Sequence, residues 1–228
     1  MELTENGVRA RLEPVAGGKA QSVSGSHLLV AVGRRPVTEG LGLEATEGRG
    51  GSWLREGRRL RPHWRALDLR HRRHRGWHPQ LAHAATAEGV VAVEHIAGLN
   101  PEPVRYTHVP GCTYSSPEIG SVGLTEEKAR AQGIDVVVGK FPFTAIGKAK
   151  VMGDTNGFLK LVAEKQYGQI LGVHIIGPRA TDLIAEGVPL VKLEYTLEEL
   201  TRTVHAHPTL AEVFHEAAHA ALGHALHM

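Results

Sequence analysis

The part of the chain after Val109 constrains the fold most, because strand-like runs and well-delimited helices alternate there. Asn156-Gly157 is a strong signal for a two-residue hairpin, and it predicts that a strand over Lys148–Met152 turns back into one over Phe158–Ala163. Apolar runs predict further short strands at Val136–Val138, Phe141–Phe143 and Ile170–Ile176. Three or four adjacent antiparallel strands flanked by helices form an α+β unit.

Capping residues mark the helix boundaries in this region. Thr125 precedes two acidic residues and predicts a helix that ends near Gln132. Thr196 and Glu199 have the T-x-x-E spacing of a capping box and predict a short helix. Two longer helices are expected over Thr181–Leu193, with Pro189 as a late kink or break, and over Leu210–Ala225.

The segments before Val109 carry weaker signals. Val8–Leu12 alternates apolar and polar residues as a half-buried strand does, and Gly17-Gly18 indicates a turn. Leu28–Val32 predicts a short buried strand. Leu81–Leu99 predicts a helix that is stopped by its penultimate glycine.

Composition limits the classes of function. A chain of 228 residues can bury a sizeable core in one or two domains, and its net charge of +2 does not indicate nucleic-acid binding. The start Met1–Asn6 is too polar to open a secretory signal, and no apolar run approaches the length that spans a membrane. Cys112 is the single cysteine, which rules out an intrachain disulfide framework. We therefore expect a cytoplasmic protein with neither a nucleic-acid nor a membrane partner.

Residues 49–76 differ in character from the rest of the chain. Ten of these 28 residues are arginine, none is valine or isoleucine, and neither a strand nor a helix period is evident. One interpretation is a basic arm in which Trp53 and Trp64 stack on nucleic acid, and another is a solvated charged loop. We favour a third hypothesis, out-of-frame translation, because GC-rich DNA read in a wrong frame yields Arg, Gly, Trp, His and Pro. The other two reading frames of the gene would test it.

The segment His205–Glu212 is a compact acid–base constellation that leads into the last helix. Pro208 disfavours the α region for His207 and so holds it on an extended stub. An imidazole exchanges protons near neutral pH, and a carboxylate within reach would orient it. Thr209 and Glu212 also have capping-box spacing, so the plain alternative is that they only cap the helix and that His207 is an ordinary turn residue.

A competing motif lies in the same helix. His215, Glu216 and His219 match H-E-x-x-H, the pattern of zinc metalloproteases. The two histidines share one helical face, but that face points away from the apolar stripe of Leu210, Val213, Phe214, Ala217, Ala218 and Ala221. A zinc-dependent hydrolase is therefore a remote alternative. We expect a solvated helix face without a built metal site, on which adventitious metal binding could occur.

The segments HAHPTLAE and GVHIIGPRATDLIAE resemble the C-terminal end of the flavoprotein disulfide reductases, and look more like dihydrolipoamide dehydrogenase than glutathione reductase. The resemblance covers 110–228 nearly throughout, and 25–48 and 77–110 in part. It implies that 111–228 form the dimerisation domain, an antiparallel sheet flanked by helices. An incomplete remnant of the nucleotide- and flavin-binding α/β region would precede it over 1–110, with 49–76 aberrant or disordered.

The resemblance also implies roles for individual residues. His207 would be the active-site base and Glu212 its partner, and both would complete the active site of a neighbouring subunit. The segment Leu81, Ala82 and His83 would lie against the flavin ring, with Tyr114 nearby. The plain alternative for the first three is the buried first turn of a packed helix.

The reaction of this family moves two electrons from dihydrolipoamide through a disulfide and FAD to NAD. This sequence has no G-x-G-x-x-G loop for dinucleotide phosphates, and a lone Cys112 cannot cycle through an intrachain disulfide. The resemblance therefore implies the C-terminal part of a homodimeric enzyme that serves 2-oxo acid dehydrogenase complexes and docks their acyltransferase (E2) component. The isolated chain would then lack activity and would not retain FAD or NAD. The alternative is an interaction module that only pairs with a second copy, with Leu210, Val213 and Phe214 on the pairing surface.

Overall fold

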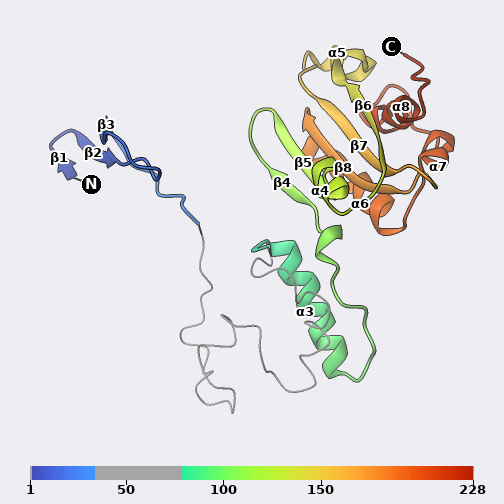
Figure 1. Cartoon of the computed structure of the whole chain (residues 1–228), viewed down its shortest axis with the longest axis horizontal. Helices are drawn as coiled ribbons and strands as arrows, with labels where there is room; N and C mark the ends of the chain where they lie inside the picture. The colour runs from blue at the N-terminus through green and yellow to red at the C-terminus, as the bar shows by residue number, and fades with distance from the viewer. Residues whose placement is uncertain (1, 34–78, 228) are drawn as a thin grey trace. The chain divides into compact units, whose positions relative to one another are not determined.

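The computed structural model describes residues 2–33 and 79–227, which lie in two separate compact units (Figure 1). The described residues of the first unit form a three-stranded antiparallel sheet of β1 (Glu2–Thr4), β2 (Gly7–Leu12) and β3 (Gln21–Gly25). The strand predicted at Val8–Leu12 is thereby confirmed. Gly17 and Gly18 lie between β2 and β3 with φ values of +81° and +136°, as a glycine turn requires.

Leu28–Val32 does not form the buried strand that its apolar run predicts. Leu29 and Val32 are 88% and 92% exposed. A strand of continuous apolar residues is buried by neighbours on its edges and faces, and within the described part of the chain no strand pairs with this run. The prediction is therefore wrong for the structure described. The hypotheses about 49–76, including Trp53 and Trp64, fall outside the described residues.

The second unit is built on a five-stranded antiparallel sheet in the order β4-β5-β8-β7-β6. Six helices and two short 3₁₀ turns accompany it in the described residues. The strands are β4 (Gly111–Thr113), β5 (Glu118–Gly123), β6 (Val136–Pro142), β7 (Phe158–Glu164) and β8 (Ile170–Gly177). The helical elements are α3 (Ala82–Ile96), η2 (Tyr106–His108), α4 (Glu126–Ala131), η3 (Phe143–Ala145), α5 (Gly147–Met152), α6 (Ala180–Lys192), α7 (Leu197–Arg202) and α8 (Glu212–Ala221). The expected α+β class is confirmed.

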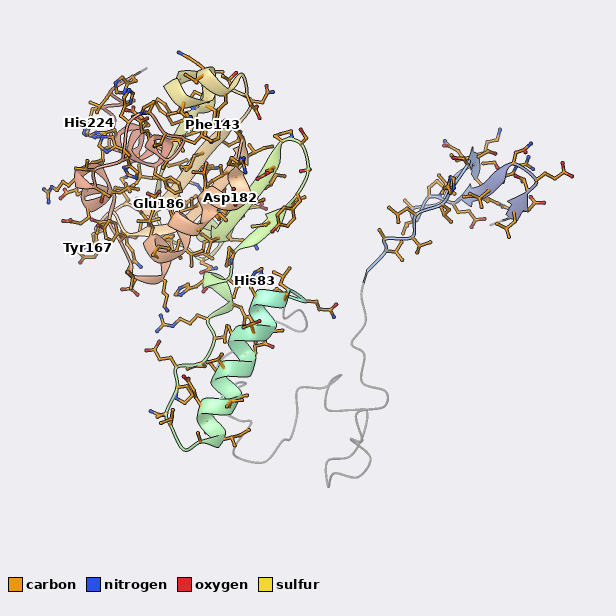
Figure 2. All side chains as sticks on the ribbon, turned by 180° about the vertical axis from the view of Figure 1, so that it is seen from behind. His83, Phe143, Tyr167, Asp182, Glu186 and His224 are labelled. Carbon is orange, nitrogen blue, oxygen red and sulfur yellow. The ribbon has the colours of Figure 1, made fainter. Side chains whose placement is uncertain are left out.

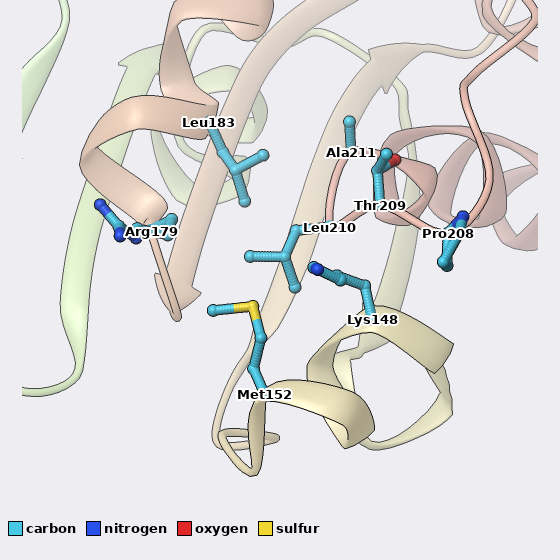
Figure 3. A pocket seen from close by; sticks show the side chains of 8 residues that line it. All are labelled: Lys148, Met152, Arg179, Leu183, Pro208, Thr209, Leu210 and Ala211. Carbon is cyan, nitrogen blue, oxygen red and sulfur yellow. The ribbon is translucent and has the colours of Figure 1, made fainter.

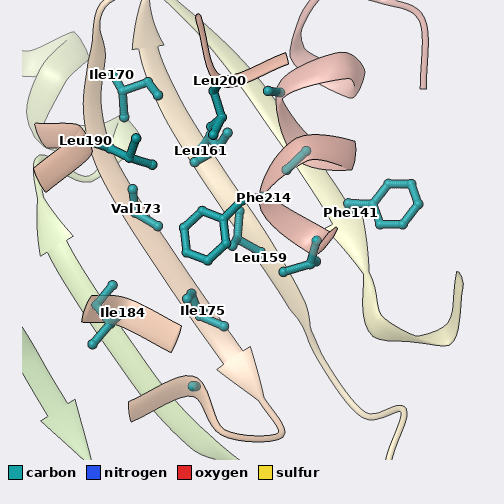
Figure 4. Close-up of a cluster of buried hydrophobic side chains, with 14 of the residues drawn as sticks. Phe141, Leu159, Leu161, Ile170, Val173, Ile175, Ile184, Leu190, Leu200 and Phe214 are labelled. Atoms are coloured by element: carbon teal, nitrogen blue, oxygen red, sulfur yellow. The ribbon is translucent and has the colours of Figure 1, made fainter. Parts of the chain in front are cut away.

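The core lies between one face of this sheet and the two helices α6 and α8. Helix α6 packs on β5 and β8, and α8 packs on β6 and β7. Figure 4 shows Phe214 of α8 projecting among strand residues such as Leu159 and Val173, all fully buried. Val213 is also fully buried and Leu210 nearly so. These residues belong to the chain's own core, so the expectation that they form a pairing surface is wrong.

Two glycines let the helices approach the sheet closely. A Cβ atom on Gly139 of β6 would lie 2.0 Å from the carbonyl oxygen of Ala217 in α8, and one on Gly120 of β5 would lie 2.4 Å from that of Ala180 in α6. No real side chain fits at those distances, so the position of each helix depends on a residue without a Cβ. Because α8 begins at Glu212, this contact also sets the position of the acid–base segment.

The hairpin predicted at Asn156-Gly157 is wrong, because Lys148–Met152 belong to helix α5 rather than to a strand. Both edges of β7 are occupied by β6 and β8, so no edge remains for a strand at this position. The two strands predicted at Val136–Val138 and Phe141–Phe143 form one strand, β6, which ends at Pro142, so Phe143 belongs to η3 instead.

The predicted helix caps are largely confirmed. Thr125 accepts a hydrogen bond from the Lys128 amide, and Thr196 accepts one from the Glu199 amide. Pro189 lies inside α6 without ending it. The last helix, α8, is shorter than predicted and lacks a side-chain cap. In the described residues, no helix combines the length and the apolar character needed to cross a membrane.

Candidate active site

His207 and Glu212 form a hydrogen-bonded pair at the start of α8. The Nδ1 atom of His207 is 2.8 Å from Oε1 of Glu212, and the imidazole is 77% exposed. The other carboxylate oxygen of Glu212 accepts a hydrogen bond from the Thr209 amide at 2.9 Å. One carboxylate thus holds the backbone with one oxygen and the imidazole with the other.

This pairing determines where the imidazole can exchange a proton. An ionised carboxylate only accepts hydrogen bonds, so the hydrogen of the shared bond is on Nδ1 of His207. Neutral His207 therefore presents a basic Nε2 to its surroundings. Burial opposes ionisation of Glu212, but hydrogen bonds from the Thr209 amide and from His207 outweigh it and lower the pKa of this carboxyl.

The capping-box interpretation of this segment is half correct. Glu212 reaches back to the Thr209 amide as a capping box requires. The Thr209 hydroxyl, however, donates to the carbonyl oxygen of Ala206 at 2.7 Å and caps nothing. Capping and orientation of the imidazole are therefore compatible, because they use different oxygens of the same carboxylate.

The residues expected near a flavin lie at the start of α3 and just after β4. Leu81 is half-buried at the N-terminus of α3, Ala82 and His83 are exposed, and Nε2 of His83 donates to the Pro110 carbonyl at 2.9 Å. Tyr114 follows β4 and is 82% exposed. The alternative of a buried first turn holds only for Ala84, which is buried, and not for the exposed Ala82 and His83.

These residues do not make a dinucleotide site by themselves. They offer exposed contact groups, and the sequence has no glycine-rich loop to bind the phosphates. The residues present therefore do not fit FAD or NAD as a complete site, although they could contribute contacts to one built mainly by other segments.

Residues 109–218 match the family described as the pyridine nucleotide-disulphide oxidoreductase dimerisation domain. The chain is 46% identical to dihydrolipoyl dehydrogenase of Bacillus subtilis, over 92% of this chain and 44% of that protein. It is 42% identical to the dihydrolipoyl dehydrogenase of Geobacillus stearothermophilus, over 100% of this chain and 48% of that protein. The crystal structure of LpdA from Mycobacterium tuberculosis superimposes with a TM-score of 0.76 at 27% identity, over 94% of this chain and 46% of that one.

The chain spans about half the length of the curated relatives it matches, and the match is to their C-terminal half. The antiparallel sheet with α6 and α8 on one face is therefore similar to the dimerisation domain that the sequence motifs implied.

The H-E-x-x-H motif in α8 is not arranged for metal catalysis. The rings of His215 and His219 lie 4.5 Å apart between centroids. Glu216 is only 4% exposed and binds the C-terminal tail, accepting hydrogen bonds from Nδ1 of His227 at 2.6 Å and from the Leu226 amide at 3.3 Å. Across 2–33 and 79–227, no group of three or more His, Cys, Asp or Glu residues could hold a metal ion.

The burial of Glu216 is a feature that sequence periodicity did not reveal. A helical wheel places this residue away from the apolar stripe, and the side chain is covered because the tail after α8 folds back over it.

A second feature that the sequence did not reveal is a shallow groove beside the acid–base segment (Figure 3). Its lining comes from α5, the start of α6 and the segment before α8, and comprises Lys148, Met152, Arg179, Leu183, Pro208, Thr209, Leu210 and Ala211.

Proposed function

We propose that this chain is the C-terminal part of a dihydrolipoyl dehydrogenase and that His207 is its active-site base, oriented by Glu212. The observation that carries this proposal is the 2.8 Å hydrogen bond between Nδ1 of His207 and Glu212 on an imidazole that is 77% exposed. An imidazole that is held on one side and open on the other suits proton exchange with a second molecule.

The chemistry of the base follows from the tautomer. Nε2 of His207 would take the proton from a thiol of dihydrolipoamide, because the thiolate is the species that attacks a disulfide. The imidazolium formed in this step would be stabilised by the adjacent carboxylate of Glu212. In the intact family enzyme the disulfide, FAD and NAD supply the electron transfer, and in this chain Leu81, Ala82, His83 and Tyr114 would only contact the flavin.

The same proposal covers the domain organisation of this chain and the proteins with which it would associate. We place the dimerisation domain at 111–228 and a partial remnant of the nucleotide-binding region at 1–110. The domain would form a homodimer in which His207 and Glu212 complete the neighbour's site, and it would dock the acyltransferase (E2) component of a 2-oxo acid dehydrogenase complex in the cytoplasm. The family match at 109–218 supports pairing between copies.

A heterodimer experiment tests the base directly. In Bacillus subtilis dihydrolipoyl dehydrogenase the residue that aligns with His207 is changed to glutamine, and this variant, once shown to be inactive, is refolded with this chain. We expect lipoamide-dependent NADH formation to return in the mixed dimer, and the His207→Gln variant of this chain to restore about 10²- to 10⁴-fold less. A mixed dimer, verified by sedimentation, that forms without turnover would contradict the proposal and leave pairing as the chain's function.

A further inference from the structure

His205 lies two residues before His207, and both of its ring nitrogens face hydrogen-bond acceptors. Nε2 is 2.7 Å from Oε1 of Glu186, and Nδ1 is 3.2 Å from the carbonyl oxygen of Thr203. The His205 side chain is only 9% exposed. In contrast to His207, this imidazole is held inside the protein and is not open to a second molecule.

The two contacts of His205 favour a charged ring. A carbonyl and a carboxylate can only accept hydrogen bonds, so both contacts are hydrogen bonds at the same time only when both ring nitrogens carry a hydrogen, as in the imidazolium form. Its hydrogen bond to Glu186 is then a charge-assisted one. In agreement, the hydrogen bond from His205 to Glu186 raises the pKa of His205 despite its burial.

Glu186 anchors this ion pair to a rigid element. It lies on α6, where it is labelled with Asp182 in Figure 2. Ile184 and Leu190 of the same helix are buried in the core, and α6 packs on β5 and β8. The bond from Glu186 to His205 therefore ties the segment before α8 to the helix layer of the domain.

The remaining hydrogen bonds of the segment connect this fixed point to the backbone around His207. The Ala206 carbonyl accepts a hydrogen bond from the Thr209 hydroxyl, and the Thr209 amide donates to Glu212. The exposed ring of His207 itself contacts Glu212. The backbone on either side of His207 is thus fixed, on one side by His205 and on the other by Glu212.

We propose that the buried ion pair of His205 and Glu186 is a positioning device for His207, which holds the backbone so that the His207 ring meets Glu212. This inference rests on the proposed function in treating His207 as the base. His205 is a positioning residue because its ring contacts Glu186 and Thr203 and is closed to a second molecule.

The test is an NMR study of the purified 228-residue chain with the variants Glu186→Ala, His205→Ala and the double variant. We expect the backbone order parameters of Ala206 and His207 to fall from about 0.85 to below about 0.6. We also expect ring ¹⁵N shifts to show that His207 loses its preference for the Nδ1–H tautomer. Because the pair acts as a unit, each single variant should produce the full loss, and the double variant should add nothing.

Two further variants separate positioning from general destabilisation. Glu186→Gln keeps the shape and one acceptor, so it should fold and retain part of the His207 tautomer preference. Asp182→Asn removes a carboxylate from the same helix that pairs with Arg179, and should leave His207 unchanged. The inference is overturned if the Glu186 and His205 variants lose stability while the order and tautomer of His207 stay as in the wild type, or if Asp182→Asn has the same effect on them. These readouts do not depend on turnover, so failure here is distinguishable from failure of the heterodimer experiment.

Discussion

The imidazoles near the C-terminus differ in the direction of their pKa shifts because their neighbours differ. The hydrogen bond to Glu186 raises the pKa of His205 despite its burial. His219 lies between His215 and His224, with ring centroids 4.5 Å and 5.1 Å away, and its Nδ1 atom is buried without a hydrogen-bond partner within the described structure. Burial and then the two neighbouring histidines lower the pKa of His219.

This difference predicts opposite pH dependences of stability. The unfolded chain binds a proton at His219 near pH 6.5, whereas the folded chain resists it, so this residue should make unfolding easier as the pH falls below 6.5. The pKa of His205 is raised, so its contribution is present below pH 6.5 and is lost as the pH rises through the folded-state value.

Urea unfolding at a series of pH values measures both effects. Relative to the wild type, His219→Gln should flatten the loss of unfolding free energy on the acid side. His205→Gln should remove stability at low pH and change little at high pH, which makes it the matched control of opposite sign. An identical acid slope in the wild type and His219→Gln would show that His219 does not titrate in this way.

The sequence could predict those helices and strands whose pattern depends only on residues close together in the chain. The α8 stripe correctly identified Val213, Phe214, Ala217 and Ala218 as buried, because a helix period depends only on neighbouring residues. The strand expected at Lys148–Met152 failed because the edges of β7 were already taken, which is a property of the whole sheet. The pair of His207 and Glu212 was expected from the family resemblance of its segment, since its spacing alone left the capping alternative open. The bond between His205 and Glu186 spans 19 residues and has no local signal.

The close contact of α8 with β6 predicts a specific sensitivity to side-chain size. A valine at Gly139 would collide with the Ala217 carbonyl and with Cβ of Ala221. Overpacking of this kind costs about 1–3 kcal/mol, and Gly139→Val should lower the unfolding free energy by about that amount in urea titrations. Gly147→Ala is the control, since a Cβ there meets nothing within 4 Å, and it should be nearly neutral. Equal stability of the two variants would mean that α8 does not rest on Gly139.

At the scale of the whole molecule, the described residues include apolar side chains that no other described residue covers. Leu29 and Val32 in the first unit, and Val93 and Ile96 of α3 in the second, are exposed. The chain also spans about half the length of the curated relatives that it matches. Buried positions in those parts could not be predicted correctly from an apolar run alone, because burial depends on segments that pack against the run and not on the run itself.

The last prediction concerns the activity of the purified chain by itself. A dihydrolipoyl dehydrogenase needs a pair of cysteines that cycle through a disulfide and loops that bind dinucleotide phosphates, and this sequence has one cysteine and no G-x-G-x-x-G loop. We therefore expect the chain to show no lipoamide-dependent turnover of NADH. From the family match at 109–218 we also expect it to sediment as a dimer, at twice its 24.6 kDa. Cys112→Ser is the control: any residual turnover that it shares with the wild type comes from contaminating full-length enzyme. Turnover that is present in the wild type and abolished in Cys112→Ser would show that this chain holds a redox centre of its own.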